Sequence, residues 1–130
     1  MKALIIGGNG FIGSNLADSL LKSGHKVTSF DRYPSRYREA DPQVTYIYGD
    51  FANHGEVQDA VKGIDWVFHL AYTTLPATSN EDPAYDVRSN IVDTLQLLDA
   101  CRQSSVKKVV FISSGGTVYG VPRNLEPIHE

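Results

Sequence analysis

The sequence predicts an α/β fold built on a doubly wound parallel sheet, and three observations predict it. Short apolar segments alternate with helical patterns, the first apolar segment runs into a glycine-rich loop, and the connections are short. With right-handed crossovers these features give five parallel strands in the spatial order 3-2-1-4-5. We expect residues 1–130 to form one domain, because a chain of this length has no room for a second full domain.

The first strand is the apolar run Ala3 to Ile6, and it enters the loop Gly7-Gly8-Asn9-Gly10-Phe11-Ile12-Gly13-Ser14. Glycines in such a loop allow a tight turn, the approach of a pyrophosphate to the backbone, and close seating of the helix on the strand. We assign these functions to Gly7, Gly10 and Gly13. Because the amides of the first helical turn face an anion, the pattern predicts a dinucleotide-binding turn.

A helix follows this loop, and its expected apolar face is Ile12, Leu16, Leu20 and Leu21. Ser23-Gly24 ends the helix, and the strand Lys26 to Phe30 then leads to Asp31. An acidic residue about 20 residues after the glycines is the expected partner of the ribose hydroxyls. Strand, glycine loop, helix, strand and carboxylate therefore occur in the order that binds a dinucleotide.

The residues after the second strand bear on which dinucleotide is bound. The Asp31 carboxylate accepts hydrogen bonds from ribose hydroxyls and repels a 2′-phosphate, so NAD is favoured over NADP. Arg32 instead favours NADP, because an arginine at this position could pair with the 2′-phosphate. The basic cluster Arg32 to Arg38 either reaches the adenosine end of a nucleotide or forms a solvated loop.

Three more strands and two more helices are expected. The third strand, Val44 to Tyr48, enters Gly49-Asp50, and a short helix over 56–62 is closed by Gly63. The near-continuous apolar run 65–71 is typical of a central strand covered on both faces. A long helix begins at Asp82-Pro83 and runs to Gln103, and the fifth strand is Val109 to Ile112. The expected buried face of the long helix is Val87, Ile91, Leu95 and Leu98.

In such sheets ligands bind beyond the carboxyl ends of the strands, where the strand order reverses between strands 1 and 4. The polar strand ends should therefore converge there although they are scattered in the sequence. These strand ends are the glycine loop, Asp31, Asp50, Ala71 and Ser113.

The composition of the chain limits the kinds of molecule that it is expected to bind. With 12 basic and 15 acidic residues and a formal charge of −3, no global field would gather nucleic acid or an anionic membrane, so a small molecule is the expected partner. The single cysteine, Cys101, lies in an apolar helical pattern, which indicates burial and is consistent with a reducing compartment. We expect a cytoplasmic protein, because neither a signal peptide nor a membrane-spanning run is visible. The four histidines lack metal-ligand spacing, so no metal site is expected.

Six motifs occur in the order found in one family. They are Gly7 to Gly13, Asp31, Gly49-Asp50-Phe51, His69-Leu70-Ala71, Asn90 to Leu95, and Ser113-Ser114-Gly115-Gly116-Thr117-Val118-Tyr119-Gly120. The chain resembles the amino-terminal portion of an extended short-chain dehydrogenase/reductase of the NAD-dependent epimerase/dehydratase family. The resemblance implies an NAD-binding Rossmann domain over residues 1–130, in a nucleotide-sugar epimerase or dehydratase that works by transient hydride transfer. An ordinary two-domain dehydrogenase fits the first turn but not the later motifs.

The resemblance also implies roles for single residues. Asp31 would hold the ribose, Asp50 and Phe51 would border the adenine, Leu70 and Ala71 would line the middle of the cofactor, and Asn90 would brace the active-site floor. The expected cofactor-binding set is Gly7, Gly10, Phe11, Ile12, Gly13, Asp31, Arg32, Asp50, Phe51, Leu70, Ala71, Tyr72, Asn90 and Ser113. Alternatively, Asp50 closes a turn, Phe51 is ordinary packing, and Asn90 is a surface amide.

The chain departs from the family at the catalytic residues. Relatives use a tyrosine and a lysine four residues later, and no Tyr-x-x-x-Lys occurs here. We expect this pair beyond Glu130, so that the chain is a portion of a longer enzyme. Gly115 stands where relatives have a serine or threonine. Either the catalytic hydroxyl would come from Ser114 or Thr117, or a backbone amide would bind the substrate oxygen, and we favour Thr117.

Three further expectations concern the whole protein. Epimerase is preferred to dehydratase, because residues 113–117 offer no carboxylate to expel water. The second hypothesis is a non-catalytic NAD-binding regulatory or interaction module, which the missing Tyr-Lys pair favours. An uncovered fifth strand invites pairing with another chain, so we expect the protein either to associate, with a homodimer as one form, or to be marginally stable unless something protects this edge.

Overall fold

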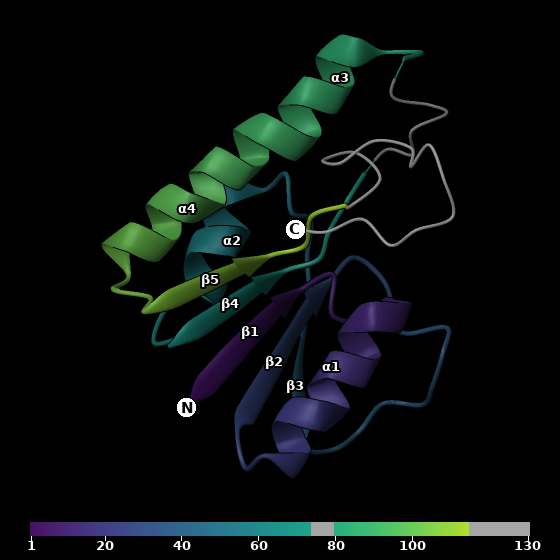
Figure 1. The fold of residues 1–130 in the computed structure, drawn as a ribbon, viewed down its shortest axis with the longest axis vertical. Helices are drawn as coiled ribbons and strands as arrows, with labels where there is room; N and C mark the ends of the chain where they lie inside the picture. The colour runs from purple at the N-terminus through teal and green to yellow at the C-terminus, as the bar shows by residue number, and fades with distance from the viewer. Residues whose placement is uncertain (74–79, 115–130) are drawn as a thin grey trace, which may run out of the picture.

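The computed structural model describes residues 1–73 and 80–114. They form a five-stranded sheet in which every neighbouring pair is parallel and the strand order is β3-β2-β1-β4-β5, as predicted (Figure 1). The strands are β1 (Lys2–Ile6), β2 (Lys26–Asp31), β3 (Val44–Tyr48), β4 (Trp66–His69) and β5 (Lys108–Phe111). Ile6 lies opposite both Phe30 and His69, so the carboxyl ends of the three central strands are level.

Helices cover both faces of the sheet (Figure 1). The helix α1 (Phe11–Lys22) packs on one face, where Ala17 and Leu20 meet Ala3 and Ile5 of β1. On the other face lie α2 (His54–Ala60) and a long helical segment made of α3 (Pro83–Val87), the π-helical turn η1 (Arg88–Val92) and α4 (Asp93–Gln103). The helix α2 begins and ends two residues earlier than the predicted range 56–62.

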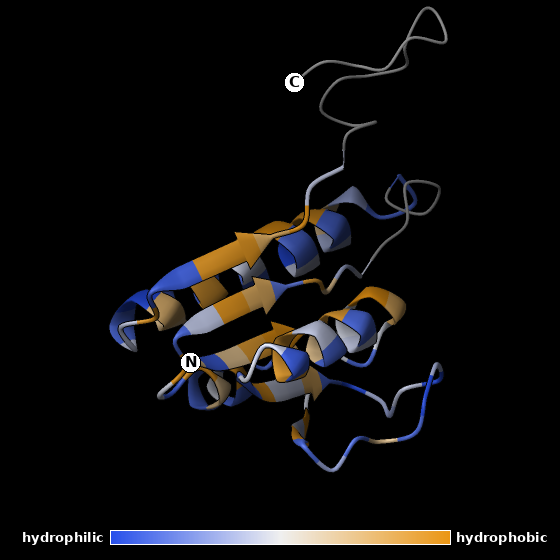
Figure 2. Ribbon diagram, turned by 60° about the horizontal axis from the view of Figure 1, so that its bottom comes forward, coloured by the Kyte–Doolittle hydropathy of each residue, from blue (hydrophilic) through white to orange (hydrophobic). Residues whose placement is uncertain are grey.

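The core runs through β1, whose residues Ala3 to Ile6 are at most 1% exposed. Leu4 and Ile6 face α2 and α4, whereas Ala3 and Ile5 face α1. Figure 2 shows the strands as the most hydrophobic part of the ribbon, between helices with mixed faces. A fully buried aliphatic side chain contributes about 1.5–3 kcal/mol to the stability of the fold, so burial holds β1 firmly in the core. The loop that follows β1 therefore starts from a fixed position.

The predicted buried face of the long helix is wrong. Val87, Ile91, Leu95 and Leu98 are all exposed, with exposed fractions between 43% and 60%. The buried residues of the segment are Ser89, Asp93, Leu97, Ala100 and Cys101. Small and hydrogen-bonded side chains on this stripe let the helix lie close to the sheet and to α2, which a stripe of large aliphatic residues would not allow.

The Cys101 thiol is buried, as predicted from its apolar surroundings. Burial raises its pKa to about 11. Cys101 is therefore protonated at neutral pH and packs as a small apolar side chain rather than acting as a nucleophile.

The predicted face of α1 needs a similar correction at its first turn. Ile12 is 56% exposed, and the buried positions are Gly13, Ser14, Ala17 and Leu20. The small residues Gly13, Ser14 and Ala17 bring the helix backbone close to the loop and strand, and Ile12 lies away from that contact.

None of the helices among residues 1–73 and 80–114 is long and apolar enough to cross a membrane.

Candidate functional site

A cleft of about 330 Å³ lies at the carboxyl ends of the strands. It is formed where the strand order reverses between β1 and β4, the place at which such sheets bind ligands. Eight of the predicted cofactor-binding residues line it, namely Gly7, Gly10, Asp31, Arg32, Phe51, Leu70, Ala71 and Tyr72. Ile6, Phe30, Gly49 and Thr73 line it as well and were not predicted.

The glycine loop turns at Gly7, whose φ is +80°, a conformation that a side chain disfavours. Its N–H donates to the carbonyl oxygen of Phe30 over 2.8 Å, which fastens the loop to the end of β2. A Cβ at Gly13 would lie 2.5 Å from the carbonyl oxygen of Gly7 and 2.6 Å from the Cα of Gly8. Gly13 is therefore required for close seating of α1 against the loop, as predicted from its position.

The helix α1 begins at the mouth of the cleft, with Gly10 as its N-cap residue. The first amides of a helix have no partner within the helix, so those of Phe11 and Ile12 are available to an anion. The side chains of these two residues are exposed and do not line the cleft. The Phe11 ring packs edge-on against Tyr37 with 5.7 Å between ring centroids.

Asp31 ends β2 and is fixed by the glycine loop. Its Oδ2 accepts the backbone N–H of Asn9 over 3.0 Å. The Asn9 side chain donates to the carbonyl oxygen of Tyr33 over 2.6 Å and accepts from the Ser29 hydroxyl over 2.7 Å. Among the described residues, the Asp31 Oδ1 has only a long contact of 3.4 Å to the N–H of Tyr33, which leaves this oxygen able to accept from a ligand hydroxyl.

Asn9 was not predicted as a site residue, although it is 6% exposed and connects the glycine loop to both β2 and the loop after it. Its position between glycines was the available signal. A polar side chain buried in such a loop must find hydrogen-bond partners.

Arg32 points toward β3 rather than toward Asp31. Its Nη2 lies 2.7 Å from Oδ1 of Asp50. The hydrogen bond to Asp50 raises the pKa of Arg32 above its ordinary value, although partial burial opposes the shift. Burial alone would raise the pKa of Asp50, but the hydrogen bonds from the Ala52 N–H and from Arg32 hold it below its usual value. Both groups are therefore charged at neutral pH and form an ion pair at the rim of the cleft.

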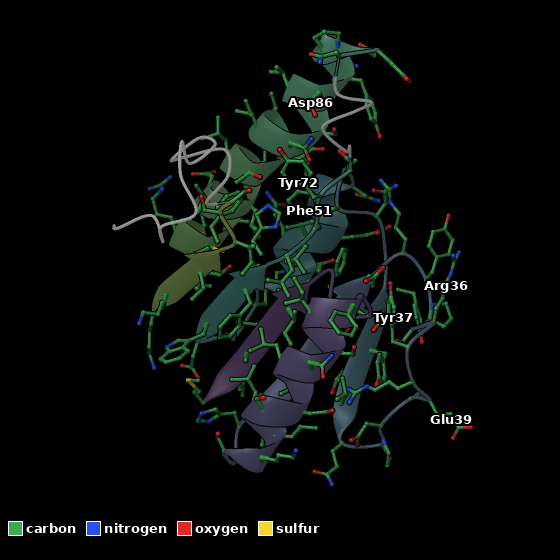
Figure 3. The ribbon with its side chains drawn as sticks, turned by 45° about the vertical axis from the view of Figure 1, so that its right-hand side comes forward. Arg36, Tyr37, Glu39, Phe51, Tyr72 and Asp86 are labelled. Atoms are coloured by element: carbon green, nitrogen blue, oxygen red, sulfur yellow. The ribbon has the colours of Figure 1, made fainter. Side chains whose placement is uncertain are left out.

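Phe51 both lines the cleft and packs in the core. It is 6% exposed, and its ring centroid lies 4.9 Å from that of the His69 imidazole. Figure 3 shows Phe51 and Tyr72 at the carboxyl end of the sheet, and Arg36 and Glu39 projecting from the loop after β2. Tyr72 is 68% exposed, so its ring is free to cover a ligand in the cleft.

Asn90 is tied to the cleft through the segment that follows β4. Its Oδ1 accepts from the N–H of Thr73 over 3.2 Å and from the Thr73 hydroxyl over 3.1 Å. The same hydroxyl lies 2.6 Å from that of Ser89, which is buried. Both Ser89 and Asn90 belong to the π-helical turn η1, a feature that often occurs at functional sites. The hydrogen bonds of Thr73 and Ser89 connect the segment after β4 to η1, a contact that the sequence pattern did not reveal.

Ser113 and Ser114 follow β5 and are exposed. Neither lines the cleft formed by the described residues. Thr117, the favoured candidate for the catalytic hydroxyl, lies outside the described residues.

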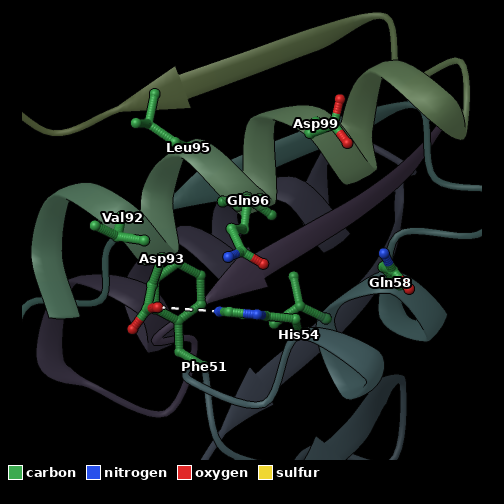
Figure 4. Close-up of a pocket in the computed structure, with 10 residues that line it drawn as sticks. Phe51, His54, Gln58, Val92, Asp93, Leu95, Gln96 and Asp99 are labelled. Atoms are coloured by element: carbon green, nitrogen blue, oxygen red, sulfur yellow. Dashed lines mark hydrogen bonds and ion pairs between the residues drawn. The ribbon is translucent and has the colours of Figure 1, made fainter. Parts of the chain in front are cut away.

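A second pocket, of about 340 Å³, lies between α2 and α4 (Figure 4). Phe51 forms part of its wall as well as part of the cleft. The Nε2 of His54 lies 3.1 Å from Oδ1 of the buried Asp93, which joins the start of α2 to the start of α4.

No group of three His, Cys, Asp or Glu side chains in the described part of the chain is placed to hold a metal ion.

The sheet order and the helices on both of its faces define a Rossmann-type fold. Residues 3–130 match the model of the NAD dependent epimerase/dehydratase family, and the chain belongs to this family.

Similar proteins include both epimerases and steroid dehydrogenases. The chain is 39% identical to a 3-beta-hydroxysteroid dehydrogenase of Mycolicibacterium neoaurum over 92% of its own length and 33% of that protein. It is 36% identical to a UDP-glucose 4-epimerase of Mycolicibacterium smegmatis, over 94% of the chain and 41% of the relative. A crystal structure of Thermus thermophilus UDP-glucose 4-epimerase in complex with NAD matches with a TM-score of 0.88 at 34% identity, over all of this chain and 43% of that one. The chain thus spans less than half the length of these proteins.

Proposed function

We propose that this chain is the NAD-binding portion of an enzyme that acts on nucleotide sugars, with epimerisation as the preferred reaction. The observation that carries the proposal is the Asp31 carboxylate at the end of β2, with Oδ1 open to a hydroxyl beside the glycine loop. The similarity to UDP-glucose 4-epimerases, one of them solved with NAD, supports the same cofactor and substrate class.

The residues of the cleft fit a dinucleotide. Gly7 and Gly10 expose backbone where a pyrophosphate would approach, and the first amides of α1 point their partial positive charge there. Asp31 would hold the adenosine ribose, and Asp50 and Phe51 would border the adenine. Leu70, Ala71 and Tyr72 would line the middle of the cofactor.

When bound, NAD would accept a hydride from a carbon of the substrate and return it. The contribution of the described residues is to bind and orient. The Asn90–Thr73 hydrogen bonds fix the backbone after β4, and the side chains of Phe51 and Leu70 would shield a bound cofactor from water. We assign the hydroxyl that would bind the reacting oxygen to Thr117, with Ser114 as the alternative.

The hydroxysteroid dehydrogenase relative favours a second candidate, in which the substrate is a steroid alcohol oxidised by the same cofactor. Both candidates need NAD in this cleft, so the substrate distinguishes them. Turnover of UDP-glucose or of a 3β-hydroxysteroid by the longer protein decides between the two. The regulatory module would be favoured instead if the protein binds NAD but its longer chain carries no Tyr-x-x-x-Lys.

The test of the cofactor site is calorimetric titration of the protein with NAD and with NADP, for the wild type and Asp31→Ala. We expect saturable NAD binding that weakens by at least about 10-fold in Asp31→Ala, since hydrogen bonds to a charged group contribute about 1.5–3 kcal/mol. Asp99→Ala, on the exposed side of α4, removes one carboxylate away from the cleft and should leave NAD affinity unchanged. A folded protein that binds no NAD would overturn the proposal.

A further inference from the structure

Arg32 stands next to the carboxylate that would hold the ribose, and a guanidinium at that position is able to pair with a 2′-phosphate. Its geometry in the structure points elsewhere. Nη2 of Arg32 lies 2.7 Å from Oδ1 of Asp50, which follows the neighbouring strand β3. The arginine is therefore already engaged by a carboxylate that the protein itself supplies.

Besides the bond to Arg32, two hydrogen bonds hold Asp50 in place. Its Oδ1 accepts the N–H of Ala52 over 2.9 Å, and its own N–H donates to Oε2 of Glu56 over 2.8 Å. The other oxygen of Glu56 accepts from the Asn53 side chain over 2.7 Å, at the first turn of α2. Because Asp50 is fixed at this turn, it cannot follow Arg32, and Arg32 must leave Asp50 to reach a phosphate beside Asp31.

We infer that Asp50 is a specificity-determining residue that retains Arg32 at the rim of the cleft and so preserves the preference for NAD that Asp31 sets. This inference rests on the proposed function, because it requires that the cleft binds NAD. Asp31 repels the 2′-phosphate directly, and Asp50 withholds the one neighbouring cation that would compensate for this repulsion.

The expected size of the effect follows from the exposure of the pair. The side chains of Arg32 and Asp50 are 44% and 50% exposed. Ion pairs this exposed shift an equilibrium by up to about 5-fold, so Asp50 modulates a discrimination that Asp31 dominates.

The experiment measures the ratio of the dissociation constants, Kd for NADP over Kd for NAD, in the wild type, D50N, R32A and the double variant. The ratio is the readout because any contact of Asp50 with the adenine affects both cofactors equally. Asparagine at position 50 keeps an oxygen for the N–H of Ala52, so the turn is preserved. D99N is the matched control, since Asp99 pairs with Arg102 at the same 2.7 Å on α4.

We expect D50N to lower the ratio by about 2- to 5-fold, and R32A and D99N to leave it at the wild-type value. The double variant should return to the wild-type ratio, because the gain requires the freed guanidinium.

Three results would overturn the inference while NAD binding stands. The first is an unchanged ratio in D50N. The second is a raised ratio in R32A alone, which would mean that Arg32 already reaches the phosphate. The third is a double variant that keeps the shift of D50N, which would show that only the charge of Asp50 matters. A folded wild type that binds neither cofactor would instead overturn the proposed function and this inference with it.

Discussion

Gly13 is the residue at which the glycine loop is most sensitive to a side chain. A Cβ there would meet backbone atoms at 2.5 and 2.6 Å, and backbone cannot move aside as a flexible side chain can. We expect Gly13→Ala to destabilise the protein by about 1–3 kcal/mol, the range of overpacking substitutions, and to weaken NAD binding. Urea unfolding and NAD titration measure both effects.

Gly55→Ala is the matched control. Gly55 lies in the first turn of α2, and the nearest atom to a Cβ there, Oδ1 of Asn53, is 3.5 Å away. Alanine favours the helix, so this variant should gain about 0.5–1 kcal/mol of stability. Equal destabilisation by both substitutions would show that the close packing at Gly13 is not the cause.

His69 is a buried imidazole whose tautomer follows from its neighbours. The Thr94 hydroxyl donates its one hydrogen to the carbonyl oxygen of Asn90 over 2.6 Å, so it must accept from Nε2 of His69, 2.9 Å away. Nδ1 is then an unprotonated acceptor, buried and without a partner among the described residues. Burial lowers the pKa of His69 from 6.5 to about 4, so the ring is neutral at neutral pH.

This pKa predicts a pH dependence of stability. As the pH falls from 6.5 toward 4, the unfolded imidazole takes up a proton that the folded one does not, so the folded state loses stability. The contribution of His69 to the slope approaches about 1.4 kcal/mol per pH unit within this window and vanishes above it. His69→Gln, which retains a donor for Thr94, should flatten the slope of urea-measured stability between pH 6.5 and 4. Equal slopes in the two proteins would contradict the prediction, because the carboxylates titrate alike in both.

At the scale of single residues, the sequence predicted the positions that follow from residue type and spacing. Gly7, Gly13 and Asp31 have the positions expected of them, because a glycine loop after an apolar strand and a carboxylate after the next strand are local signals. Thr73 and Ser89 were missed, because their meeting depends on how the π-helical turn lies against the segment after β4. No spacing in the sequence encodes that contact.

The elements were predicted better in their order than in their orientation. The strand β3 begins and ends where expected, and each of the other strands lies within the expected region or one residue from it. The long helix failed in its buried face because it carries two apolar stripes, and periodicity does not say which faces the core. Leu97, Ala100 and Cys101 form the buried stripe, and the larger aliphatic residues that attracted the prediction form the exposed one.

Two leucines on α4 test this orientation directly. Leu97 is 0% exposed and packs in the core beneath the helix, whereas Leu95, two residues earlier, is 60% exposed. Leu97→Ala should cost about 2–5 kcal/mol of stability, the range for buried leucines, and Leu95→Ala should change it by no more than about 0.5 kcal/mol. Chemical unfolding of both variants measures the difference. Equal losses would mean that Leu95 is also buried and that the helix faces the sheet differently.

At the scale of the whole molecule, sheet order and site follow from one another. Alternating strands and helices with right-handed connections left one plausible order, and that order brings the glycine loop, Asp31 and Phe51 to one cleft. These residues are far apart in the sequence, yet parallel strands place all their carboxyl ends at one edge. This is why the cleft was predictable when several of its packing contacts were not.

The same packing leaves an apolar helical stripe and the edges of the sheet open to other chains. The exposed stripe of Val87, Ile91, Leu95 and Leu98 runs along α3, η1 and α4. Among the described strands, β5 has only β4 as a neighbour, and Phe111 at its end is 53% exposed. Exposed apolar surface and unpaired strand edges both favour association.

We expect the protein to self-associate through the helical stripe, since its four apolar side chains are all exposed along one helical segment. Ile91→Lys/Leu95→Lys places two charges in that stripe and should shift the protein toward a monomer in light scattering over a range of concentrations. Gln96→Lys/Gln103→Lys adds the same charge at exposed polar positions of α4 and should not. Both pairs of sites are exposed, so stability should change little in either variant. If association persists in the first variant, the free edge of β5 becomes the interface, and a wild type that is monomeric at all concentrations would contradict self-association altogether.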